Sequence, residues 1–194
     1  NKTEEYFLHL LCAFVNNTKP ETVSGIDDNM LYGLSKIHSV SGIIGYLADK
    51  YPIIQSPEVA QKLKNDFLKT LYLQTTRNCR MNEIIDMLTE NGIDHLLFKG
   101  FVIKDCYPMP ELRTYGDIDF VIHEEDRDKV HELMLGRGYE FTTNFMDQVY
   151  CYKKEKEFYE IHTSVLSIDI TPTADYIGYF KNMWENALII KGRT

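Results

Sequence analysis

Two aspartates one residue apart, Asp117 and Asp119, offer the clearest chemistry in this chain. The segment around them alternates between polar and apolar residues, which predicts a β-strand, and residues two apart on a strand point to the same face. Two carboxylates held that close repel each other, and a divalent cation is the usual means of keeping them together. The pair therefore predicts a metal site suited to phosphate chemistry.

A second pair, Glu160 and His162, has the same spacing in the segment YEIH. Glu160 is expected to complete a clamp of three carboxylates around two cations, one next to the attacking oxygen and one next to the leaving group. The alternative for Glu160 is a surface acid, because the charged run 153–157 lies close by. Three roles are open for His162: orienting Glu160, contacting the substrate, or serving as a hydrogen-bonded, half-buried histidine.

Lys99, Gly100 and Arg113 are the candidate phosphate ligands. Gly100 follows a short apolar run where a strand is expected to turn into a helix, and glycine there lets backbone N–H groups approach an anion. The alternative is a glycine needed only for a tight turn. Arg113 lies four residues before Asp117 and is suited either to binding a phosphate with both guanidinium arms or to pairing with one of the acids.

The elements that must position these residues divide the chain in two. Residues 1–91 are expected to be helical, and residues 92–194 are expected to form a mixed β-sheet flanked by helices, which together make an α+β protein. The predicted helices are one capped by Thr3, then 30–39, 41–50, and a long one from Ser56 to Asn91 that is kinked or split near 75–78. The later segments predict strands at 94–98, 117–123, 139–143, 148–153 and 158–165, and helices at 101–106 and 124–137. Because Ile118, Phe120 and Ile122 must face the core, the two aspartates are expected on the open face of their strand.

Composition narrows the classes of partner. The net charge is −8, which disfavours nonspecific binding to nucleic acid without excluding it, since phosphate neutralisation needs a basic surface. The four cysteines are scattered without metal-binding spacing, as is typical of a reduced cytoplasmic protein. No apolar segment approaches the length of a membrane span, so no membrane partner is expected.

The motifs together make the resemblance to a family specific. The segments LLFKG, YPMPELRTYGDIDFVI and YEIH resemble the uncharacterised bacterial nucleotidyltransferases of the polymerase β superfamily. The flanking segments LYGLSKIHSVSGIIGYL and NMWENALII are similar to the regions that precede and follow the core in that family. The resemblance implies a nucleotidyltransferase fold, two Mg²⁺ ions and a nucleoside triphosphate donor, with ATP expected.

The resemblance also assigns roles to individual residues. It implies that Asp117 and Asp119 are the metal-binding pair and that Glu160 is the third acid. Lys99 and Gly100 match the turn on the phosphate side, and Arg113 matches the arginine before the pair. Family members usually continue into further helices, so the core at 92–194 is expected to be truncated at its C-terminal end.

The expected activity is therefore transfer of a nucleoside monophosphate to an acceptor hydroxyl, with release of pyrophosphate. A small-molecule acceptor resembles the case of the aminoglycoside nucleotidyltransferases, and a protein or RNA acceptor resembles that of the toxin–antitoxin nucleotidyltransferases. The rival interpretations are a catalytically silent module that binds nucleotides or a partner, and an interaction protein whose helical half is the active surface.

Overall fold

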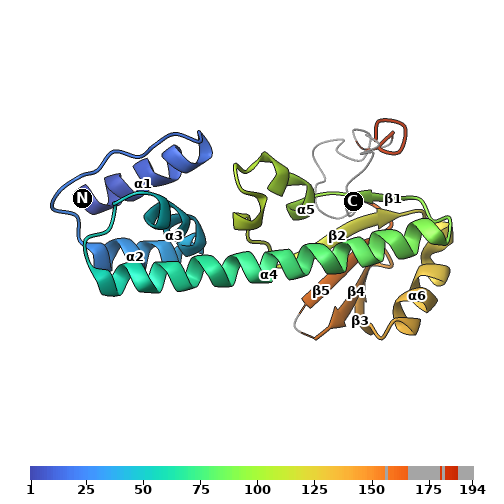
Figure 1. The fold of residues 1–194 in the computed structure, drawn as a ribbon. Helices are drawn as coiled ribbons and strands as arrows, with labels where there is room; N and C mark the ends of the chain where they lie inside the picture. Colours follow the sequence, from blue (N-terminus) through green and yellow to red (C-terminus); the bar gives the residue numbers. More distant parts are fainter. Residues whose placement is uncertain (156, 166–179, 181, 188–194) are drawn as a thin grey trace. The chain divides into compact units, whose positions relative to one another are not determined.

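The computed structural model describes residues 1–155, 157–165, 180 and 182–187, and its elements are drawn in Figure 1. The chain forms two compact units. The first contains Asn1–Asn82 and Val102–Tyr115, and the second contains Glu83–Phe101 and Gly116–Thr194. The segment 102–115 thus lies with the N-terminal helices, although the expected strands flank it in the sequence.

Helices build the first unit. They are α1 (Lys2–Val15), α2 (Asp28–Ile37), α3 (Ser41–Lys50) and α4 (Pro57–Glu90), of which α4 runs on into the second unit. Asn1, not the expected Thr3, caps α1, because its side chain accepts hydrogen bonds from the Thr3 and Glu4 amides. The helix α4 is a single helix of 34 residues, so the break expected near 75–78 is wrong.

The core of the first unit is made by apolar side chains of these helices. Leu10 and Phe14 of α1, Leu31 of α2, Ile44 of α3 and Leu63 of α4 are all buried. Aliphatic and aromatic side chains that repeat at helical spacing on each helix provide this contact surface.

Short helical turns complete the first unit. The segment that begins with α5 (Gly100–Ile103) continues through 3₁₀ turns at Lys104–Cys106 and Pro110–Leu112. The Lys104 ammonium donates to Asn78 Oδ1 at 2.8 Å, and the Arg77 guanidinium donates to the Tyr115 carbonyl. These bonds tie the segment to α4.

The second unit contains a five-stranded mixed sheet. Its strands are β1 (His95–Leu97), β2 (Asp117–Ile122), β3 (Glu140–Phe145), β4 (Val149–Lys154) and β5 (Glu157–His162). They are ordered β1-β2-β5-β4-β3, and β2 and β5 are parallel whereas the other pairs are antiparallel. The predicted α+β fold, with an N-terminal helical region followed by a mixed sheet and helices, is confirmed.

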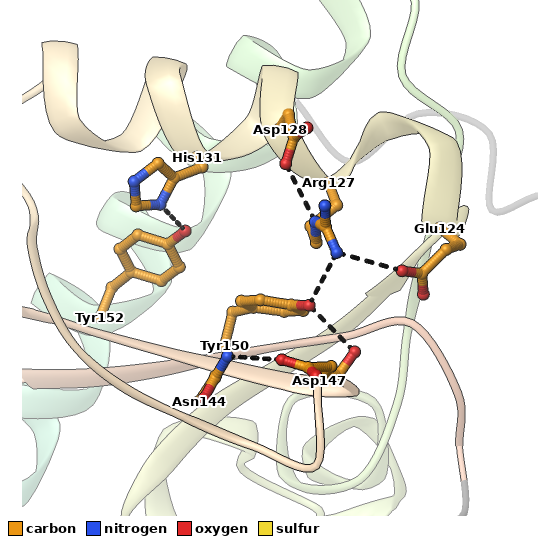
Figure 2. Close-up of polar contacts among 8 residues, drawn as sticks. All are labelled: Glu124, Arg127, Asp128, His131, Asn144, Asp147, Tyr150 and Tyr152. Carbon is orange, nitrogen blue, oxygen red and sulfur yellow. Dashed lines mark hydrogen bonds and ion pairs between the residues drawn. The ribbon is translucent and has the colours of Figure 1, made fainter.

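One face of the sheet packs against α6 (Arg127–Gly136), which follows a 3₁₀ turn at Glu124–Asp126. The Arg127 guanidinium donates to the Tyr150 hydroxyl at 3.3 Å, and His131 Nδ1 is 2.8 Å from the Tyr152 hydroxyl. Figure 2 shows both contacts between α6 and the sheet. Burial raises the pKa of Tyr152 to about 12, so its hydroxyl stays neutral at physiological pH.

The strand register shows which side chains share this core face. Tyr150 and Tyr152 pair with Ile161 and Tyr159 of β5, which in turn pair with Phe120 and Ile118 of β2. All six side chains are buried, with Phe120 and Tyr159 fully inaccessible. The other face of the same strands therefore carries Asp117, Asp119, Glu160 and His162.

None of the helices within the described ranges is both long and apolar enough to cross a lipid bilayer. Each of the four cysteines lies in those ranges and is a free thiol.

Candidate active site

The parallel pairing of β2 with β5 brings Asp119 next to Glu160. These two residues are direct partners in the register, so their side chains leave the same face of the sheet. His162 lies one row further along, opposite Val121, and Asp117 lies one row back, opposite Phe158. The two motifs, which are about forty residues apart in the sequence, thus meet on the face opposite α6.

Three of these side chains converge closely. One potential ligand atom from each of Asp119, Glu160 and His162 lies within 4.8 Å of the other two. His162 Nε2 is 3.1 Å from Asp119 Oδ1 and 3.4 Å from Glu160 Oε2. Asp117 shares the face but is not part of this trio.

Lys99 joins the same cluster from the end of β1. Its ammonium donates to Asp119 Oδ1 and lies 3.9 Å from Glu160 Oε2. The left-handed backbone at this turn belongs to Lys99, with φ of +52°, whereas no positive φ occurs at Gly100. The turn thus directs the lysine side chain to the acids, and Gly100 begins the four-residue helix α5.

Asp119 is buried, with 3% of its surface exposed, so the expectation that the acids lie on an open face is wrong for this residue. Its carboxylate contacts both Lys99 and His162, and the Phe98 ring packs edge-on against His162 at 5.0 Å between centroids. Residues from outside the two strands therefore cover a face that strand alternation alone predicts to be open.

The two central carboxyl groups have pKa values that move in opposite directions. Burial acts to raise the pKa of Asp119, but hydrogen bonds from His162 and Lys99 outweigh it and hold the pKa below its usual range. Burial raises the pKa of Glu160, and the negative charges of Asp117 and Asp119 raise it further. Lys99 and His162 thus stabilise Asp119 as an anion, whereas burial and the nearby aspartates make the charge on Glu160 unfavourable.

This difference predicts how Glu160→Gln changes stability. A carboxyl group whose pKa is higher in the folded than in the unfolded state destabilises the fold when it ionises, and this penalty disappears as pH falls through the folded-state pKa. We expect Glu160→Gln to raise the Tm of the EDTA-treated protein by a few degrees at pH 7, with a smaller gain at acidic pH. Thermal unfolding between pH 4 and 7 measures this, and a lower Tm at pH 7 would contradict it.

Phe98 and Cys151 lie next to the trio, and the sequence does not identify either of them as a site residue. Cys151 is buried and pairs directly with Glu160 across β4 and β5. Burial raises the pKa of its thiol, and the charges of Glu160 and Asp117 add to this effect. The alternation of apolar and polar residues in 148–153 is the only sequence signal for Cys151, and it does not reveal which strand lies alongside.

Arg113 belongs to the first unit. Its guanidinium donates to the Thr114 carbonyl and lies 6.0 Å from the centre of the Tyr107 ring. Neither of its two expected roles, binding phosphate or pairing with an acid, is tested by these contacts, and both stay predictions.

The trio fits a divalent cation. Oxygen and nitrogen ligands about 2.1 Å from an octahedral ion lie roughly 3 to 4 Å apart, so only a small contraction is needed from the spacing found here. Two carboxylates and an imidazole suit Mn²⁺, and the carboxylates suit Mg²⁺.

A scan against protein-family models matches residues 24–192 to a family described as uncharacterised nucleotidyltransferase. The chain belongs to this family. The match includes the central motifs and both flanking segments that carry the resemblance, so that identification is confirmed.

Among solved structures, the chain is similar to a lincosamide antibiotic adenylyltransferase with lincomycin bound. The sequences are 21% identical, and the match covers 46% of this chain and 56% of the other, with a TM-score of 0.37. A comparison with curated proteins gave no match.

Proposed function

We propose that this family member transfers a nucleoside monophosphate from a nucleoside triphosphate to an acceptor hydroxyl and releases pyrophosphate. The observation that carries the proposal is the approach of Asp119, Glu160 and His162 to within 4.8 Å on one sheet face. Side chains from two separate motifs form this cluster in a chain of a nucleotidyltransferase family. The reaction needs anionic ligands that hold divalent cations at the phosphates, and this cluster contains two such ligands.

In this proposal, Asp117 and Asp119 hold two Mg²⁺ ions. Glu160 holds the cation next to the attacking hydroxyl and accepts its proton. Mg²⁺, when bound, supplies charge stabilisation for the transferred phosphoryl group and the leaving pyrophosphate. Asp119 has the strongest support, because its hydrogen bonds with Lys99 and His162 keep it ionised at neutral pH.

The remaining site residues bind or position the substrate in this proposal. Lys99, the backbone near Gly100, and Arg113 hold the triphosphate, with ATP as the expected donor. His162 contacts both carboxylates of the trio, which supports a role in orienting Glu160. The acceptor is a hydroxyl of a small molecule or a protein in the cytoplasm, and the net charge of −8 makes RNA the less favoured acceptor.

The test uses the full chain with each of ATP, GTP, CTP and UTP in Mg²⁺. Pyrophosphate release and label transfer are measured against a panel of hydroxyl acceptors and the protein itself. Equilibrium binding of the α,β-methylene analogue of each nucleotide with Mn²⁺ is measured in parallel. We expect metal-dependent binding of one analogue, and consumption of the matching nucleotide when the acceptor is present. Binding without consumption against any acceptor would favour a silent nucleotide-binding module, and no metal-dependent binding at all would overturn the proposal.

A further inference from the structure

Lys99 has a feature that triphosphate binding does not explain. Its ammonium contacts Asp119 Oδ1 and lies 3.9 Å from Glu160 Oε2, so it sits among the atoms offered to the cation. Binding of a phosphate by Lys99 would not require its ammonium to pair with Asp119, which is the most buried acid of the site.

Burial explains why Asp119 needs this contact. A carboxylate with 3% exposure is costly unless a positive charge or hydrogen bonds compensate for lost water. Lys99 and His162 supply that compensation. The ammonium also lies 5.0 Å from the centre of the Phe98 ring, which adds a cation–π contact in a site of reduced polarity.

A divalent cation and the Lys99 ammonium cannot both bind the same oxygen of Asp119, because their charges repel at contact distance. The lysine is able to leave, since its side chain is 48% exposed and flexible. Its Cα is fixed in the turn between β1 and α5, so a displaced ammonium stays near the site and becomes available to an anion.

We propose that Lys99 is an internal counter-ion that occupies the cation position until metal and nucleotide arrive together. When metal binds, it would replace the Lys99 ammonium at the Asp119 carboxylate. The displaced ammonium would then pair with the triphosphate. This inference rests on the proposed function, and it makes Lys99 a positioning residue that couples the two ligands. Without nucleotide, metal binds weakly because it must displace an ammonium that then has no phosphate to pair with. Nucleotide strengthens metal binding because its phosphates become the new partner of the ammonium.

The test measures Mn²⁺ binding by electron paramagnetic resonance, with and without α,β-methylene-ATP. We expect Lys99→Met to bind free Mn²⁺ about tenfold more tightly than wild type and to lose most of the tightening that nucleotide causes, in the usual range for coupled ligands. Lys129→Met is the matched control, because it removes the same charge from an exposed lysine on α6 that donates to the Asn91 carbonyl. It is expected to behave like wild type.

The alternatives give different results. If Lys99 stays on Asp119 when metal binds, Lys99→Met leaves free Mn²⁺ affinity unchanged or weakens it, which overturns the inference while wild type still binds Mn²⁺ with nucleotide. If neither wild type nor the variants bind Mn²⁺ with nucleotide, the proposed function itself fails.

Lys99→Gln is a second variant in case Lys99→Met folds poorly, since its amide keeps a donor for Asp119 without the charge. Thermal unfolding supplies an independent readout for both variants. They should be less stable than wild type in EDTA and gain more Tm from Mn²⁺, because a ligand that binds more tightly stabilises the fold more. An equal Mn²⁺-induced gain in wild type and in both variants would overturn the inference.

Discussion

Replacing Asp119 with Asn is expected to lower the rate of nucleotidyl transfer by at least about 1000-fold, which is the upper range for loss of a single electrostatic stabiliser. The substitution preserves the shape of the side chain and removes the charge that a cation needs. Asp119 is the more buried of the two carboxylates in the trio, and both Lys99 and His162 contact its Oδ1 atom. Steady-state kinetics with an acceptor identified by the transfer assay measures the effect, and Mn²⁺ affinity should fall in parallel.

The matched control is Asp128→Asn, which removes the same charge from a side chain that is 85% exposed and pairs with Arg127. It is expected to leave the rate unchanged, since it lies on α6 and the acids lie on the opposite face of the sheet. Equal activity of Asp119→Asn and wild type would contradict the metal site. Equal losses in both variants would indicate a general charge effect.

Asp119→Asn should also change how stability depends on pH, with the opposite sign to Glu160→Gln. The lowered pKa of Asp119 means that its anion stabilises the fold above the unfolded-state pKa of about 3.9, and this contribution is lost as pH falls through the folded-state pKa. In EDTA at pH 7, the variant should therefore unfold at a lower temperature than wild type, and the difference should narrow in strong acid.

The second large effect concerns the helical unit. A methyl group at Gly45 on α3 would lie 2.2 Å from the Leu63 carbonyl oxygen and 2.9 Å from Phe67 Cβ on α4. The nearest obstacle is backbone, which has no rotamer to change, so the two helices must move apart. We expect Gly45→Ala to destabilise the protein by about 3 kcal/mol. That cost corresponds to a drop in Tm of roughly 6 to 12 °C for a chain of this size.

Gly33→Ala provides the control for this prediction. Gly33 lies within α2, and a methyl group added there would meet no other atom within 4 Å among the described residues. Alanine is the better helix former by about 1 kcal/mol, so this variant should raise the Tm slightly. Thermal unfolding of both variants compares a close helix contact with an open helix position. If Gly45→Ala is as stable as Gly33→Ala, the close packing of α3 on α4 is wrong.

The sequence by itself determined the type and order of most elements, and it predicted the acids of the candidate site. Helical spacing predicts α3 at Ser41–Lys50 with the bounds that the structure has. Alternation around Asp117 predicts β2, and the same parity rule places Glu160 and His162 on one face of β5. These predictions succeed because they depend on local periodicity, which each segment carries within a few residues. Local periodicity is a weaker guide to where a helix breaks, and α4 continues through the polar stretch 75–78 where the sequence predicts a kink.

Only the tertiary structure decided which acids meet and what covers them. The parallel register sets Asp119 beside Glu160 and leaves Asp117 one row away, and a change of one residue in that register would point the two motifs to opposite faces. Asp119 is buried, and its carboxylate contacts Lys99, which follows β1, and His162 of β5. Contacts between segments far apart in the sequence leave no periodic signal in either one. The pairing of β2 with β5 in the folded sheet therefore brings two separate acidic motifs together in one candidate site.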